Sequence, residues 1–285
     1  FLWGEARGNG IYFSATGTSG QLAAQKLRQF DILATNELAS WEKLYKVINM
    51  ANSVIKYAPK VQDASFNENV RNSYISEAYF LRSLAYFYLV RLWKDVPFVQ
   101  EPYVDDTAPY DVAQSKGELI LQQCLVDLEN SIEAAKTRFP EIDATNPVNT
   151  KGRATKWSVY ALIADINLWL GNYDGAIAAC ESIINSGQVG LISGANWFLN
   201  YFPGNSNESI FEIQYSYSLN QTNAFITWFY TNKYYYISPY QQTLFESNAG
   251  DKRGLNASYN SSGYIWKYSG INATTTTLRN TSLQN

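Results

Sequence analysis

Apolar residues recur at helical spacing through residues 40–187 and predict five α-helices. The helices begin at a Ser40 cap, near Asn67, at a Ser115–Glu118 capping box, near Thr155, and directly after a Gly171–Tyr173 turn. In the first, Asn52 is the one polar member of an apolar face, and we expect it to satisfy buried backbone groups. Pro140 closes the region of the third helix, and Ser186-Gly187 stops the fifth.

The second predicted helix contains the run EAYFLRSLAYFYLVRLWKDVPFV, Glu77–Val99, which is apolar on nearly every side. Arg82 and Arg91 leave too few residues between them for the roughly 20 that a membrane span needs. Pro97 stops the helix, because proline restricts the residue before it and lacks a backbone donor. The run therefore predicts a core helix, whose two arginines bury their stems and send their guanidinium groups to partners or to water.

The last two predicted helices, in LWLGNYDGAIAACESII, resemble a tetratricopeptide-type hairpin. Small residues allow the helices to approach closely, and we expect Leu168 and Tyr173 to fill the wedge between them. Cys124 and Cys180 lie among apolar residues at helical spacing. They are interpreted as small core residues rather than as a disulfide, and they lack metal-ligand spacing.

Outside this helical stretch the pattern is irregular. Residues 1–39 are rich in Gly, Ser and Thr and predict loops. The stretch ESIFEIQYSY, Glu208–Tyr217, alternates and predicts a short strand, while Trp228–Tyr240 is aromatic without a clear period. Pro239 opens a short helix, and surface loops are expected from Asn248 onward.

The composition of the chain excludes several classes of function. The net charge is −3 and no basic patch indicates nucleic acid. The chain has no His, which excludes His-based acid–base catalysis and most catalytic zinc sites. Aromatic residues make up 15% of the chain and Tyr dominates them, a composition that suits half-wet surfaces facing ligands such as sugars.

Several segments resemble, in the expected order, the SusD/RagB family of surface lipoproteins of Bacteroidota. The segments are WEKLYKVINMANSVI, SEAYFLRSLAYFYLVRLWKDVPFV, CLVDLENSIEAA, GRATKWSVYALIADINLWLGNYDGAIAACESIINSG, ESIFEIQY and GDKR. Lys94 stands where the family usually has Gly before Asp95. The family's lipidated N-terminus and its C-terminal helical region are expected to be missing from this chain.

The resemblance implies a mostly α fold of tetratricopeptide-like hairpins with long irregular loops and a few short strands. We expect a single SusD-like domain, a fragment, over residues 1–285. Within it, residues 40–187 form the helical repeat scaffold and residues 188–285 the loop-rich ligand side. The resemblance also implies a nutrient receptor, commonly for a glycan, on the outer-membrane surface, attached through a lipid anchor and partnered with a SusC-like TonB-dependent transporter.

Two stretches are candidates for contact with a sugar, because flat rings cover C–H faces and polar groups bond the rim. The predicted ligand-binding residues are Trp3, Arg7, Asn9 and Tyr12 in the opening loop, and Trp228, Tyr230, Tyr234, Tyr235 and Tyr236 in the aromatic segment. Each ring has a competing interpretation as packing against the core. No catalytic residue, metal ligand or cofactor is predicted, and Asp105-Asp106 is interpreted as a solvated turn rather than a calcium site.

Two other functions remain open. An aromatic-rich helical-barrel glycoside hydrolase or lyase needs two carboxylates flanking the bond, and no motif marks such a pair among Glu208, Glu212 and Asp251. A protein-binding repeat scaffold would continue its repeat at about 34 residues, and the pattern stops after Gly187.

Overall fold

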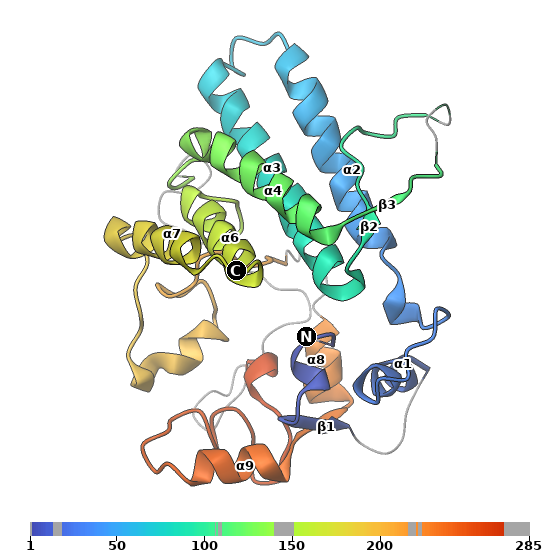
Figure 1. The fold of residues 1–285 in the computed structure, drawn as a ribbon. Helices are drawn as coiled ribbons and strands as arrows, with labels where there is room; N and C mark the ends of the chain where they lie inside the picture. The colour runs from blue at the N-terminus through green and yellow to red at the C-terminus, as the bar shows by residue number, and fades with distance from the viewer. Residues whose placement is uncertain are drawn as a thin grey trace. The chain divides into compact units, whose positions relative to one another are not determined.

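The computed structural model describes residues 2–13, 19–105, 107, 110–139, 151–215, 221 and 224–270. The chain divides into two compact units (Figure 1). The helical unit comprises Trp41–Gly190 with Ile210–Glu212, and the mixed unit comprises Phe1–Ser40, Leu191–Ser209 and Ile213–Asn285. The fold is mostly α-helical, which confirms the predicted fold class. The predicted single domain over residues 1–285, with its division at residue 187, stays a prediction.

The helical unit is built from antiparallel neighbours. Its elements are α2 (Glu42–Tyr57), α3 (Glu68–Trp93), β2 (Val96–Pro97), β3 (Gln114–Ser115), α4 (Gly117–Ser131), α6 (Lys156–Trp169) and α7 (Tyr173–Ser186). Helix α3 packs against α2 and α4, and α6 packs against α7. Strands β2 and β3 form a short antiparallel pair next to the end of α3.

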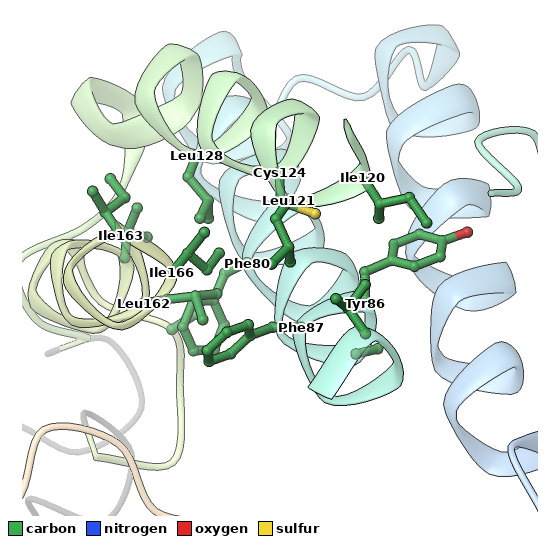
Figure 2. Close-up of a cluster of buried hydrophobic side chains, with 14 of the residues drawn as sticks. Phe80, Tyr86, Phe87, Ile120, Leu121, Cys124, Leu128, Leu162, Ile163 and Ile166 are labelled. Carbon is green, nitrogen blue, oxygen red and sulfur yellow. The ribbon is translucent and has the colours of Figure 1, made fainter. Parts of the chain in front are cut away.

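Helix α3 is the centre of this unit, as its sequence predicts. Figure 2 shows Phe80 and Phe87 of α3 pointing toward Leu121 of α4 and Ile166 of α6, and all four are almost completely buried. Each such side chain contributes roughly 1.5–3 kcal/mol by leaving water. Among the described helices, α3 included, none is long and apolar enough to cross a membrane.

Polar side chains attach the segment after β2 to the helices. The Tyr86 hydroxyl donates to the Val99 carbonyl at 2.8 Å and accepts from the Val99 N–H at 2.7 Å. Asn52 Nδ2 donates to the Val99 carbonyl at 3.0 Å. The predicted role of Asn52 in satisfying buried backbone groups is therefore confirmed.

The two caps predicted for α2 and α4 are wrong. Helix α2 begins at Glu42, after Trp41, and no side chain caps it. Helix α4 begins at Gly117, and the Ser115–Glu118 capping box does not form. Instead Asp95, which follows α3, accepts the Gly117 N–H through Oδ1 at 3.0 Å. A carboxylate from a distant segment thus replaces the local hydroxyl.

The α6–α7 hairpin forms where predicted, but its turn is held by different residues. Leu168 and Tyr173 are 56% and 65% exposed and do not fill a wedge. Asn172 Nδ2 donates to Asn167 Oδ1 at 2.9 Å, and Asn172 Oδ1 accepts the Gly175 N–H at 3.3 Å. A Cβ at Gly175 would lie 2.6 Å from Asn172 Nδ2, so a larger residue would displace the Asn172 side chain that caps α7.

Both cysteines are free thiols, as expected, but only Cys124 is buried. Cys180 is exposed, because its side of α7 does not face α6. Trp169 at the end of α6 is 52% exposed, while its ring still meets Phe87 edge-on.

The strand predicted at Glu208–Tyr217 is absent from its described part, residues 208–215. Phe211 packs edge-on against Phe80, and the Glu212 N–H donates to the Lys151 carbonyl at 2.8 Å. Ile213 points outward and is 75% exposed. Phe211 and Ile213, which would share one face of a strand, thus point to opposite sides, and no ladder of backbone hydrogen bonds forms along these residues.

The mixed unit joins the two ends of the described chain. Its elements are β1 (Ile11–Phe13), α1 (Ser19–Arg28), α8 (Ala224–Ile226), β4 (Tyr235–Ile237) and α9 (Pro239–Glu246). Helix α1 lies in the stretch predicted to be loops, which is a correction. Its buried residues, Gln21, Ala24 and Leu27, recur about once per turn, but only two of them are apolar, which masks the pattern.

Candidate functional site

The two stretches of predicted ligand residues meet in one antiparallel sheet. Strand β1 comes from the opening stretch and β4 from the aromatic segment, with Ile11 opposite Ile237, Tyr12 opposite Tyr236 and Phe13 opposite Tyr235. Successive side chains of a strand point to opposite faces. The Ile and Phe positions with Tyr235 therefore form one face, and Tyr12 with Tyr236 forms the other.

The first face is core. Phe13 and Tyr235 meet edge-on at 4.8 Å, and Phe229 and Ile265 belong to the same buried cluster. Tyr235 is 2% exposed, and burial raises the pKa of its hydroxyl well above the usual range. Tyr235 therefore supports the sheet from beneath and is not available to a ligand at the surface.

The second face carries a row of tyrosines, Tyr12, Tyr236 and Tyr264, which we call the tyrosine ladder. The Tyr12 and Tyr236 rings stack with centroids 5.1 Å apart and planes 22° apart. Tyr264 extends the row, with its centroid 4.7 Å from that of Tyr236. Tyr12 is 37% exposed, so the end of the ladder is open to solvent.

A tight turn brings Tyr264 to the ladder. Asn260 Oδ1 accepts the N–H groups of Ser262 and Tyr264, each at 3.0 Å. Gly263 has φ +81°, a conformation that favours glycine, and its carbonyl accepts the Ile237 N–H at 2.9 Å. The prediction from sequence missed Tyr264. Its only local signal is the Gly before an alternating Tyr-Ile-Trp-Lys run.

Tyr236, the central ring of the ladder, is uncharged at neutral pH. A hydrogen bond with Tyr264, followed by burial, raises the pKa of Tyr236 to about 12. The Lys233 ammonium lies 4.9 Å from the Tyr264 ring centroid and covers that end of the row. Stacked rings cover each other's faces. The ladder thus offers ring edges, hydroxyls that both donate and accept, and the outer face of Tyr12.

Trp3 and Arg7 belong to a different cluster. The Trp3 indole N–H donates to the Leu38 carbonyl at 3.0 Å. The Arg7 guanidinium carbon lies 5.6 Å from the Trp3 ring centroid and 4.7 Å from that of Phe30. Asn9 is exposed, and its carbonyl accepts the Ser238 hydroxyl, which fixes the start of β1 beside α9. These three residues organise the opening segment and are not in the ladder.

The remaining predicted aromatics vary in exposure. Trp228 is half-buried and packs against Phe225 and Tyr235. Tyr234 is half-buried, and its hydroxyl accepts from Asn232 Nδ2 at 2.6 Å. Tyr230 is 45% exposed, which keeps it available to a ligand next to the sheet.

Acidic groups suited to a metal are not clustered in the part of the chain that the structure describes, where no three potential ligands gather. Asp105 accepts the Thr107 N–H at 3.0 Å, as in a capped turn, and Asp106 lies outside the described residues.

Comparison with known proteins identifies the family. The family model described as starch-binding SusD-like proteins associating with the outer membrane matches residues 13–168, more than half of the chain. The chain therefore belongs to the SusD-like family, as its motifs predict.

Individual relatives agree. The SusD-like protein P25 of Formosa agariphila is 27% identical over 153 residues, which are 54% of this chain and 27% of that protein. A SusD superfamily structure from Bacteroides fragilis superposes with TM-score 0.76 at 21% identity, covering 94% of this chain and 62% of that one. Surface glycan-binding protein A from Bacteroides thetaiotaomicron, solved with laminarihexaose, gives TM-score 0.62 at 23% identity over 75% of this chain and 43% of that one. The chain spans less than half the length of the curated relatives it matches.

Proposed function

We propose that this protein binds a glycan at the tyrosine ladder on the outer surface of a Bacteroidota outer membrane and transfers it unmodified to a TonB-dependent transporter. The observation that carries the proposal is the pairing of Tyr12 with Tyr236, which stacks an exposed ring on a half-buried one at the point where both predicted stretches meet. Neutral phenols match the alternating C–H and hydroxyl surface of a sugar.

The family supports this proposal. The matching family model is described as starch-binding and associating with the outer membrane. Two solved relatives are described as a laminarin-binding SusD-like protein and as a glycan-binding protein in complex with laminarihexaose. The proposal goes beyond binding to uptake, because it places the protein at the outer membrane and has it deliver the glycan to a transporter.

The ladder is tested with the purified chain and a panel of neutral polysaccharides that includes an α-glucan and laminarin. Retention in affinity electrophoresis and calorimetry measure binding, and an assay for new reducing ends measures cleavage. We expect binding without cleavage. Each stacking ring contributes about 1 kcal/mol, so Tyr12→Ala should weaken binding roughly fivefold.

Tyr240→Ala is the matched control, because Tyr240 is also exposed, at 57%, but lies on α9 outside the ladder. Equal affinities of wild type and of the Tyr12→Ala and Tyr236→Ala variants for every glycan bound would remove the ladder from the site. Release of sugar by the pure chain would favour the hydrolase or lyase alternative.

A further inference from the structure

The helical unit contains a concave surface of its own, lined by none of the ladder's residues. A groove of about 990 Å³ lies where α3 ends, α4 begins and α6 ends. Its apolar lining includes Val90 and Leu121, which are buried, and Trp93 and Trp169. Trp169 is 52% exposed, so an indole surface faces solvent in this groove.

The charged lining of the same groove has one more cation than carboxylates, in a chain whose net charge is −3. Arg91, Lys94 and Lys116 line it, together with the carboxylates of Asp95 and Glu118. Asp95 is already engaged through both oxygens, with the Gly117 N–H at 3.0 Å and Lys116 Nζ at 2.9 Å. Its negative charge is therefore committed to the start of α4.

Arg91 is held by aromatic rings more than by its carboxylate neighbour. Its guanidinium carbon lies 5.0 Å from the Phe87 ring centroid and 5.4 Å from that of Trp169. The nearest atoms of Arg91 and Asp165 are 3.9 Å apart, and Asp165 is 57% exposed. A guanidinium over rings keeps its planar N–H groups for a carboxylate or a sulfate.

Lys94 is strained at this place. Its φ is +66° and its ψ −86°, a region that non-glycine residues rarely occupy. The turn is fixed on both sides, because the Lys94 N–H donates to the Val90 carbonyl at 2.9 Å and its own carbonyl abuts Gly117. Glycine would adopt these backbone angles with less steric strain than lysine. This backbone outlier at a groove is the observation that motivates a role for the Lys94 ammonium group.

We propose that this groove binds an anionic oligosaccharide, with a uronate or sulfate group on Arg91 and Lys94 and a sugar ring against Trp169. One acidic sugar carries a flat C–H face and a negative charge side by side, which matches an indole next to two cations. An acidic peptide offers the charge without the flat apolar face. The proposal concerns a different surface from the ladder and does not depend on glycan binding there.

The test uses the full 285-residue chain and calorimetry with three sugars of similar length: an oligogalacturonate, a sulfated galactan oligosaccharide and a neutral galacto-oligosaccharide. At least one anionic sugar should bind, more weakly at about 500 mM than at about 50 mM NaCl because salt screens the charges. The neutral sugar should not compete for the groove.

Lys94→Gly separates binding from folding. It should raise Tm by roughly 2–4 °C by relieving the positive φ, and it should weaken anionic-sugar binding at least about fivefold, a loss of one charge-assisted contact. Arg91→Gln should weaken it similarly. Lys43→Gln, which removes an exposed charge from α2 of the same unit, should leave binding unchanged.

Unchanged affinity in Lys94→Gly and Arg91→Gln, or loss of binding in Lys43→Gln to the same degree, would overturn the proposal. So would equally tight binding of a poly-glutamate peptide, because the groove would then recognise charge alone. The Tyr12→Ala/Tyr236→Ala variant must keep anionic-sugar binding, so failure at one surface is distinguishable from failure at the other.

Discussion

Arg82 is a charged side chain enclosed by three helices. From α3 its guanidinium donates to Asp127 on α4 at 2.6 Å and to Asn52 on α2 at 2.9 Å. The side chains of Arg82 and Asp127 are 5% and 12% exposed. Because breaking such a pair leaves the other charge uncompensated, Arg82→Met should lower the free energy of unfolding by about 3–5 kcal/mol, as measured by urea denaturation.

A double variant shows whether the loss comes from the stranded carboxylate. Arg82→Met/Asp127→Leu should lose less stability than Arg82→Met alone. Lys46→Ala breaks an ion pair whose members are 70% and 67% exposed, and it should leave the urea midpoint unchanged. A double variant no more stable than the single one would contradict this account.

At the scale of elements, helix α4 depends on a cap from another part of the chain. Asp95 holds the first N–H of α4 and a lysine at once, and its negative charge also complements the helix N-terminus. Asp95→Ala should therefore lower Tm by a few degrees in calorimetry. Ser115→Ala, at the residue that a local capping box would use, should leave Tm unchanged. A larger loss of Tm in Ser115→Ala than in Asp95→Ala would contradict this assignment and favour the local capping box.

The starts of the helices differ in how far the local sequence predicts them. The start of α3 was expected near Asn67, and Asn67 caps it, because its apolar run and its cap are local signals. Helix α1 was missed because Gly, Ser and Thr precede it and its buried positions are few. The cap of α4 was assigned wrongly because its true partner, Asp95, lies 22 positions away.

The candidate site was predicted by composition and not by geometry. Both aromatic stretches were found, yet nothing local reveals that β1 pairs with β4, since Asn9 and Ser238 lie 229 positions apart. Only that register separates Tyr236, which is on the outer face, from its neighbour Tyr235 in the core. Burial of alternate residues in such a short strand depends on its partner.

For the whole molecule, the absence of His predicts a broad stability plateau. The pKa of Asp251 is lowered, first by its hydrogen bond to Arg253, and the pKa of Asp63 and Glu101 is lowered by hydrogen bonds to Ser65 and Lys56. A carboxyl whose pKa is lower in the folded state stabilises the fold fully at pH values above its unfolded pKa. This stabilisation is lost as the pH falls through the folded pKa. Tm should thus be level from about pH 5 to 9 and fall below about pH 4.

The alkaline limb has the opposite sign. The folded pKa of Tyr236 is raised to about 12, so its contribution is complete below about pH 10, the unfolded value, and is lost as pH rises toward 12. Calorimetry across this range checks both limbs. Asp251→Asn should make the fall of Tm at acid pH less steep and leave the alkaline fall unchanged. A step in Tm between pH 5 and 8 would contradict this explanation, since the chain has no His.

The pairing of β1 with β4 also sets an order in time. During synthesis the residues of α2 to α7 leave the ribosome before Tyr236 and Tyr264 exist, whereas Tyr12 has emerged long before them. The nascent chain carries one of the ladder's three tyrosines without the other two until translation has passed residue 264. The ladder therefore cannot be complete until every residue of the helical unit has been synthesised.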